Sequence, residues 1–139
     1  MSAGTGVRHS EQNGSETEGV HFLQIWIVPD RRDHSPGYEQ KNFPAEARRG
    51  RLRLLASPDG ADGSVSLHQD VRLFGALLAD TEGVTHATGA RYAWLQIVTG
   101  TVDVGGATLG PGDAASFGPG ESVDVKATAD TELLLFDLA

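Results

Sequence analysis

Apolar and polar residues alternate through most of the chain from Arg51 onward, in short runs of strand length. The alternation is clearest at 65–67, 102–104 and 123–125, where every second residue is valine or leucine. Glycine, proline and aspartate interrupt these runs at short intervals, which is typical of turns between strands. The pattern predicts about six to eight short antiparallel strands, and therefore an all-β sandwich or small barrel.

A separate apolar run, VHFLQIWIV, occupies residues 20–28 and stops at Pro29. Its β-branched and aromatic residues leave both faces apolar, so it predicts a strand covered on both sides, in a sandwich or at an interface. An uncovered run would expose more apolar surface than a monomer usually tolerates. We therefore predict a homodimer about a two-fold axis. The predicted interface residues are Phe22, Leu23, Ile25, Trp26 and Ile27.

Residues 29–50 contain three prolines and scattered charges, and they show no sustained hydrophobic period. The segment predicts an interdomain linker or a packed Ω-like excursion. One short helical turn is expected around 44–49, because proline is well tolerated at a first helical position. The basic residues beside it are expected to form a solvated patch, or to meet an acidic surface across a dimer contact. These residues are Arg48, Arg49, Arg51 and Arg53.

Composition narrows the functional classes. The chain has 139 residues and a net charge of −8, which disfavours nucleic acid or an anionic membrane as a partner. The sequence contains no cysteine, so disulfides and thiol nucleophiles are excluded. No apolar run reaches the roughly 18–20 residues that span a bilayer. These features predict a cytoplasmic protein with a single hydrophobic core.

His9 and Glu11 stand two residues apart near the start of the chain. On an extended strand both side chains would point to the same face, and an imidazole with a carboxylate supplies half of a divalent metal site. The remaining ligands would have to come from elsewhere. The candidates are His21, His34, His68 and His86, or a second chain.

The run YAWLQIVTGTVDVGGATLGPGDAASF, at 92–117, resembles the core of a cupin, because its PGD is similar to the second cupin motif. The runs HFLQIWIVPD, PGYEQ and LRLLASPDGADGSV resemble pirin-like bicupins, a group that includes proteins with quercetin dioxygenase activity. The resemblance implies a C-terminal cupin (RmlC-like jelly-roll) β-barrel at 51–139, after a linker at 29–50. Residues 1–28 would then be the remnant of a first cupin barrel, from a natural short form or a truncated two-barrel protein.

Pirin-like proteins hold their metal in the first barrel, through an H-x-H pair and a later H-x-E pair. His9 and Glu11 match the later pair, and this chain has no counterpart of the first. The resemblance therefore implies no resident cofactor, or a weakly bound divalent iron, nickel, copper or zinc ion if the site is completed.

In the second barrel the general cupin pattern places metal ligands near Ala87 and Gly89, at Ala93 and at Ser116, and none of these residues can serve. His86 is off this register by one residue, and such a slip would turn its side chain to the other face. The resemblance thus implies a second barrel that binds no metal in the usual way.

Two further sets of residues are candidate sites. Trp94, Gln96 and Phe117 are expected in the core, or alternatively in a small pocket with His86 and Arg91 at its mouth for an anionic or aromatic ligand. His68 and Asp70 share a strand face and are a candidate His–Asp dyad for general-base catalysis.

Two classes of function follow. The first is a non-catalytic module that binds a small molecule or takes part in assembly, chiefly with a second copy of itself. The second is an enzyme. It would be either a metal-dependent quercetin 2,3-dioxygenase-like protein whose site is completed in trans or whose chain is incomplete, or a metal-independent barrel acting on a small metabolite.

Overall fold

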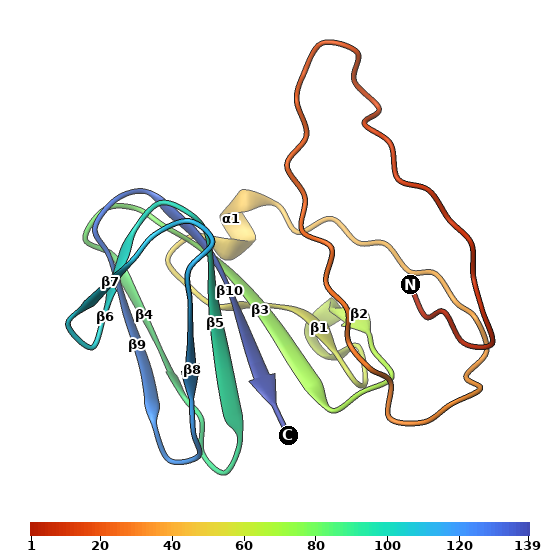
Figure 1. Ribbon diagram of the computed structural model, residues 1–139. Helices are drawn as coiled ribbons and strands as arrows, with labels where there is room; N and C mark the ends of the chain where they lie inside the picture. Colours follow the sequence, from red (N-terminus) through yellow and green to blue (C-terminus); the bar gives the residue numbers. More distant parts are fainter.

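The computed structural model describes residues 1–139, and all its strands lie in the region that follows residue 52 (Figure 1). Two sheets pack face to face as the antiparallel, all-β cupin architecture that the alternation and the resemblance predict. The six-stranded sheet has the order β2 (Val65–Ser66), β1 (Arg53–Ser57), β3 (Val71–Leu78), β10 (Thr131–Leu138), β5 (Tyr92–Thr99) and β8 (Ala114–Phe117). The four-stranded sheet has the order β4 (Gly83–Ala87), β9 (Ser122–Ala127), β6 (Val102–Val104) and β7 (Ala107–Leu109).

The sequence pattern accounts for most of these strands, with two differences. Strand β4 was not expected, because its residues GVTHA carry a single strongly apolar side chain. The two-residue pair of β1 and β2 is parallel, whereas every other pairing in the two sheets is antiparallel.

The core lies between the two sheets and is built by alternation along each strand. Leu133 and Leu135 of β10 face it together with Leu95 and Ile97 of β5. Val123 and Val125 of β9 close it from the four-stranded sheet. These side chains are almost fully buried, so the hydrophobic effect at this contact supplies the main stabilisation of the barrel.

The segment before residue 45 contains no strand and forms a long excursion that leaves the barrel and returns to it (Figure 1). The predicted strand at 20–28 is therefore wrong. None of its backbone groups pairs with another backbone group, and the segment runs across a sheet face rather than along an edge, where pairing would be possible.

The backbone and side chains of the loop between β2 and β3 hold the end of this segment. The backbone N–H of Asp30 donates to the carbonyl of His68 at 2.7 Å, and the Gln69 amide donates to the carbonyl of Val28 at 2.9 Å. The imidazole of His34 stacks on that of His68, with ring centroids 3.9 Å apart, and its Nε2 lies 2.6 Å from the carboxylate of Asp30. The N-terminal segment is thus tied to the barrel at one end of β3.

The predicted helical turn is confirmed as α1 (Ala45–Arg48), with Pro44 at its N-cap rather than at its first helical position. Arg48 forms an ion pair with Glu132 of β10 at 2.5 Å, and the N–H of Gly50 donates to the carbonyl of Leu77 at 2.8 Å. The last part of the predicted linker therefore packs against β3 and β10. No helix of the structure has the length and apolar character needed to cross a membrane.

We expect Leu133→Ala to lower the free energy of unfolding by about 2–5 kcal/mol, because it leaves a cavity at a fully buried site. Urea denaturation of purified protein measures the change. Val7→Ala removes apolar atoms from an exposed site of the N-terminal segment and should change stability by less than about 0.5 kcal/mol. Equal effects of the two substitutions would contradict the placement of the core.

Candidate functional site

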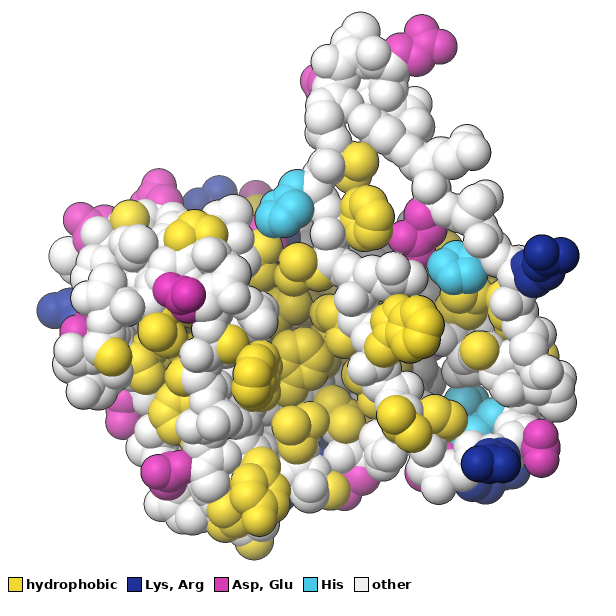
Figure 2. Space-filling view, in the orientation of Figure 1, with side chains coloured by type: hydrophobic (Ala, Val, Ile, Leu, Met, Phe, Trp, Pro, Cys, Tyr) yellow, Lys and Arg dark blue, Asp and Glu magenta, His cyan; other side chains and the backbone are white.

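The outer face of the six-stranded sheet carries an apolar groove of about 460 Å³, covered on one side by residues 23–27. Alternation along β5 and β10 places Trp94, Leu134 and Phe136 on this face, opposite to the core. Figure 2 shows hydrophobic side chains gathered between the barrel and the N-terminal segment. The groove is lined by Leu23, Gln24, Ile25, Trp26, Ile27, Val71, Trp94, Gln96, Leu134, Phe136 and Leu138.

The predicted interface residues belong to this surface. Four of them line the groove, and Phe22 extends the same apolar segment. Trp26 is 87% exposed, so its indole contacts little of its own chain. An exposed tryptophan next to an apolar groove is characteristic of a surface that binds another protein.

The five predicted pocket residues do not meet in one pocket. Trp94 and Gln96 lie on the outer face, where the Gln96 amide donates to the carbonyl of Asp113 at 3.0 Å. Phe117 faces inward and packs against the core. His86 and Arg91 meet elsewhere, at the end of the barrel. The five residues therefore do not line one pocket together, and the core position expected for the first three holds for Phe117 but not for Trp94 or Gln96.

A polar cluster joins His86 and Arg91 through Asp137 of β10, a residue that the sequence analysis did not single out. Asp137 is 4% exposed and points inward, because it continues the inward face of Leu133 and Leu135. Its carboxylate accepts hydrogen bonds from the Arg91 guanidinium and lies 3.1 Å from Nε2 of His86. The sequence did contain a signal for this residue, because Asp137 is the single aspartate of TELLLFDL, a run that is apolar on both faces.

The inward direction of His86 corrects the expected register of the barrel. Its ring lies 5.6 Å from that of Phe74, a side chain packed against the core, whereas the neighbouring Ala87 is exposed. Ser116, placed at a ligand position by the general cupin pattern, pairs with Trp94 on the outer face. The strand at 83–87 was not predicted, so the sequence analysis could not establish which of its side chains point towards the core.

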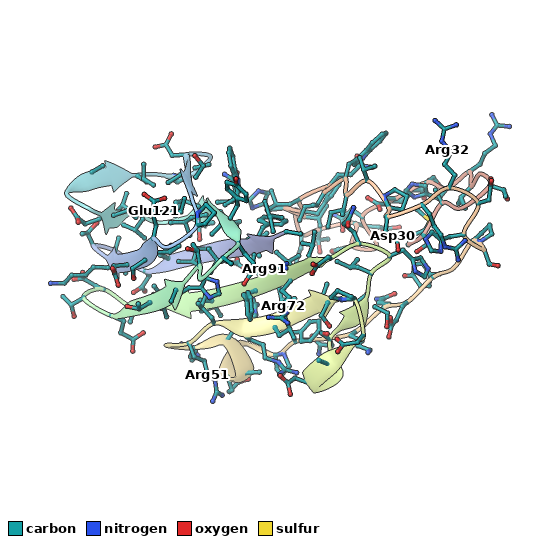
Figure 3. The ribbon with its side chains drawn as sticks, turned by 90° about the horizontal axis from the view of Figure 1, so that it is seen from below. Asp30, Arg32, Arg51, Arg72, Arg91 and Glu121 are labelled. Atoms are coloured by element: carbon teal, nitrogen blue, oxygen red, sulfur yellow. The ribbon has the colours of Figure 1, made fainter.

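Arg91 connects this cluster to the loop before β3 (Figure 3). Its guanidinium donates to both carboxylate oxygens of Asp70, at 2.9 and 3.0 Å. These bonds hold the pKa of Asp70 below its usual range, and Asp70 and Asp137 together raise the pKa of Arg91. The predicted His68–Asp70 dyad is not formed, because Asp70 is engaged by Arg91 and the His68 ring stacks on His34.

The two predicted metal ligands lie close together in the N-terminal segment. Nδ1 of His9 is 3.9 Å from a carboxylate oxygen of Glu11, and both side chains are exposed. The structure contains no group of three or more His, Cys, Asp or Glu side chains arranged to hold a metal ion. Since a resident transition metal takes three or four protein ligands, this donor pair does not by itself fit one.

We expect Asp70→Asn to destabilise the protein at neutral pH, and this effect to fade in acid. The folded-state pKa of Asp70 is depressed, so its pairing with Arg91 stabilises above the unfolded-state pKa and is lost as pH falls through the folded-state pKa. The stability difference between wild type and variant should be present at about pH 7 and absent at about pH 2. Urea denaturation at both pH values measures it.

The control for this prediction is Glu16→Gln, which removes an exposed carboxylate that takes part in no ion pair. It should change stability little at either pH. An Asp70→Asn variant that is as stable as wild type at neutral pH, or equally destabilised at both, would contradict the role given to this pair.

Comparison with known proteins agrees with the fold and the motifs. The chain is 42% identical to a quercetin 2,3-dioxygenase of Escherichia coli over 99% of its own length, and it is 37% identical to a pirin-like protein of Caulobacter vibrioides. It spans 59% and 60% of the lengths of these two relatives.

Solved structures show the same similarity. The crystal structure of YhhW from E. coli superposes with a TM-score of 0.75 at 34% identity, over 82% of this chain and 48% of that one. The nickel(II) complex of the same bacterial pirin gives a TM-score of 0.73. The profile of the quercetinase C-terminal cupin domain matches residues 54–138. This chain therefore belongs to the quercetinase C-terminal cupin domain family of pirin-like proteins.

Proposed function

We propose that this pirin-like cupin is a non-catalytic assembly module that docks a second copy of itself through the apolar groove. The observation that carries the proposal is the pairing of that groove with Trp26, which projects beside it and is 87% exposed. Val28 and Phe22 add exposed apolar surface on the same segment. Burial of such a surface is favourable at about 25 cal/mol per Å² of apolar area.

A second copy suits this surface because each chain carries both a projecting apolar segment and a recessed apolar groove. In an isologous two-fold contact the segment of each copy enters the groove of the other, so both features are covered at once. The backbone groups of residues 20–27, which form no hydrogen bond with another backbone group, supply further hydrogen-bonding capacity in such a contact. The chain has a net charge of −8, but no charged residue lines the groove. Two copies could therefore meet there without repulsion between like charges at the centre of the contact.

Light scattering coupled to size-exclusion chromatography tests this assembly. We expect wild type to elute with about twice the 14.7 kDa mass of one chain, and Trp26→Asp to elute as a monomer because a carboxylate would be buried in the contact. Trp94→Asp, on the groove side of the same contact, should have the same effect.

Tyr38→Asp is the matched control, since it replaces an exposed aromatic residue outside the groove and should leave the dimer intact. A monomeric wild type would contradict the proposal. A wild type that stays monomeric and instead binds a different cupin barrel through this groove would contradict it as well. So would variants of both tryptophans that remain dimeric.

A second candidate function is metal-dependent quercetin 2,3-dioxygenase-like activity, which the names of the relatives and the proximity of His9 and Glu11 favour. Since this pair supplies two ligands, the others would come from a second chain or from a longer form of this one.

Incubation of the protein with nickel, iron, copper or zinc ions, followed by desalting and elemental analysis, tests this candidate. A completed site should retain metal at a fixed ratio to protein and consume quercetin, and His9→Ala should lose both properties. Gln12→Ala, which changes a residue beside the pair that is not a candidate ligand, is the control and should retain them. Metal retention that is unchanged by His9→Ala would rule out this site.

A further inference from the structure

A second cavity, of about 680 Å³, lies on the other side of β3 from the apolar groove. Phe74 and Arg72 of β3 line it, whereas Val71 of the same strand lines the groove. Leu52 and Leu54 complete an apolar wall that continues into the core. A cavity of this size suits a small organic ligand.

Three arginines surround this cavity, which is unusual in a chain with 19 acidic and 11 basic residues. Arg51 and Arg72 lie on the side of the sheet near α1 and β1, away from Arg32 (Figure 3). Arg53 of β1 is the third. Guanidinium groups remain charged at every physiological pH and match the geometry of carboxylates.

Two of these guanidinium groups are held in place by backbone carbonyls. Arg51 donates to Ala47 and Glu46 at the end of α1, at 3.1 and 2.9 Å. Arg53 donates to the carbonyl of Asp62. Each retains N–H donors beyond those used, since a guanidinium carries five.

Arg72 differs from the other two because its guanidinium makes no hydrogen bond and no ion pair within the chain. The carboxylates that line the same cavity do not engage it. Asp59 accepts hydrogen bonds from the Ser57 hydroxyl at 2.9 Å and the Ala61 N–H at 3.1 Å, which lower its pKa, with a smaller contribution from the charge of Arg72. The other lining carboxylate is that of Asp62. With three cations and two anions, the lining keeps a net positive charge.

We propose that this cavity binds a small aromatic carboxylate, with its carboxylate on Arg72 and its ring against Phe74, Leu52 and Leu54. The unpartnered guanidinium provides the charge-assisted hydrogen bonds, and the anchored Arg51 and Arg53 add positive potential at the mouth. The cavity holds one lining cation in excess of its carboxylates, which matches a monoanion better than a dianion. This site is independent of the proposed assembly surface, because the two lie on opposite faces of β3.

Titration of ¹⁵N-labelled protein with benzoate, followed by heteronuclear NMR, tests the site. We expect saturable shifts at the backbone amides of Leu54 and Phe74. Benzamide has the same shape without the charge, and acetate has the charge without the ring, so both should bind more weakly than benzoate. Loss of charge-assisted hydrogen bonds in Arg72→Gln should reduce benzoate affinity about tenfold.

Arg32→Gln is the matched control, because it removes an exposed arginine of the N-terminal segment that does not line the cavity. It should leave the affinity for benzoate unchanged. Absence of saturable shifts, equal binding of benzoate and benzamide, or an unchanged affinity of Arg72→Gln would each overturn the proposal. A monomeric protein that binds benzoate would refute the assembly surface while leaving this site intact.

Discussion

Strand β10 is the element on which the other features depend. It pairs with β3 along all eight of its residues and with β5 along seven, so it forms the centre of the six-stranded sheet. Its inward residues Leu133 and Leu135 build the core, and its outward residues Leu134 and Phe136 line the groove. Asp137 ends the inward row and holds the polar cluster. One strand that is apolar on both faces therefore builds both the core and the apolar groove.

The polar cluster explains how a buried carboxylate is tolerated at the end of this strand. A lone buried charge would be strongly unfavourable, but Asp137 has Arg91 as a hydrogen-bonded partner and His86 beside it. Arg91 in turn engages Asp70 in the loop that precedes β3. The same loop, through His68 and Gln69, ties down the N-terminal segment. One connected set of contacts therefore runs from the end of β10, through Arg91 and this loop, to the segment that covers the groove.

Sequence reasoning predicted the strands wherever apolar residues alternate, because burial against one partner sheet imposes a period of two. It failed at β4, whose residues are mostly polar or small, and that failure carried over to the facing of His86. It also failed at residues 20–28, where apolar character was interpreted as strand pairing. Pairing depends on a free strand edge, and the segment lies on a sheet face. The contacts of the cluster around Asp137 join residues 21 to 51 positions apart, a proximity that local pattern does not encode.

The basic run around residue 50 shows how the same residues acquire different roles once the chain folds. Arg48 pairs with Glu132, while Arg51 and Arg53 are turned by α1 and β1 towards the cavity that Arg72 also lines. Because the side chains of Val71 and Arg72 leave β3 on opposite faces, the apolar groove and the charged cavity are separated by one strand. The two faces are therefore chemically distinct although one strand carries both.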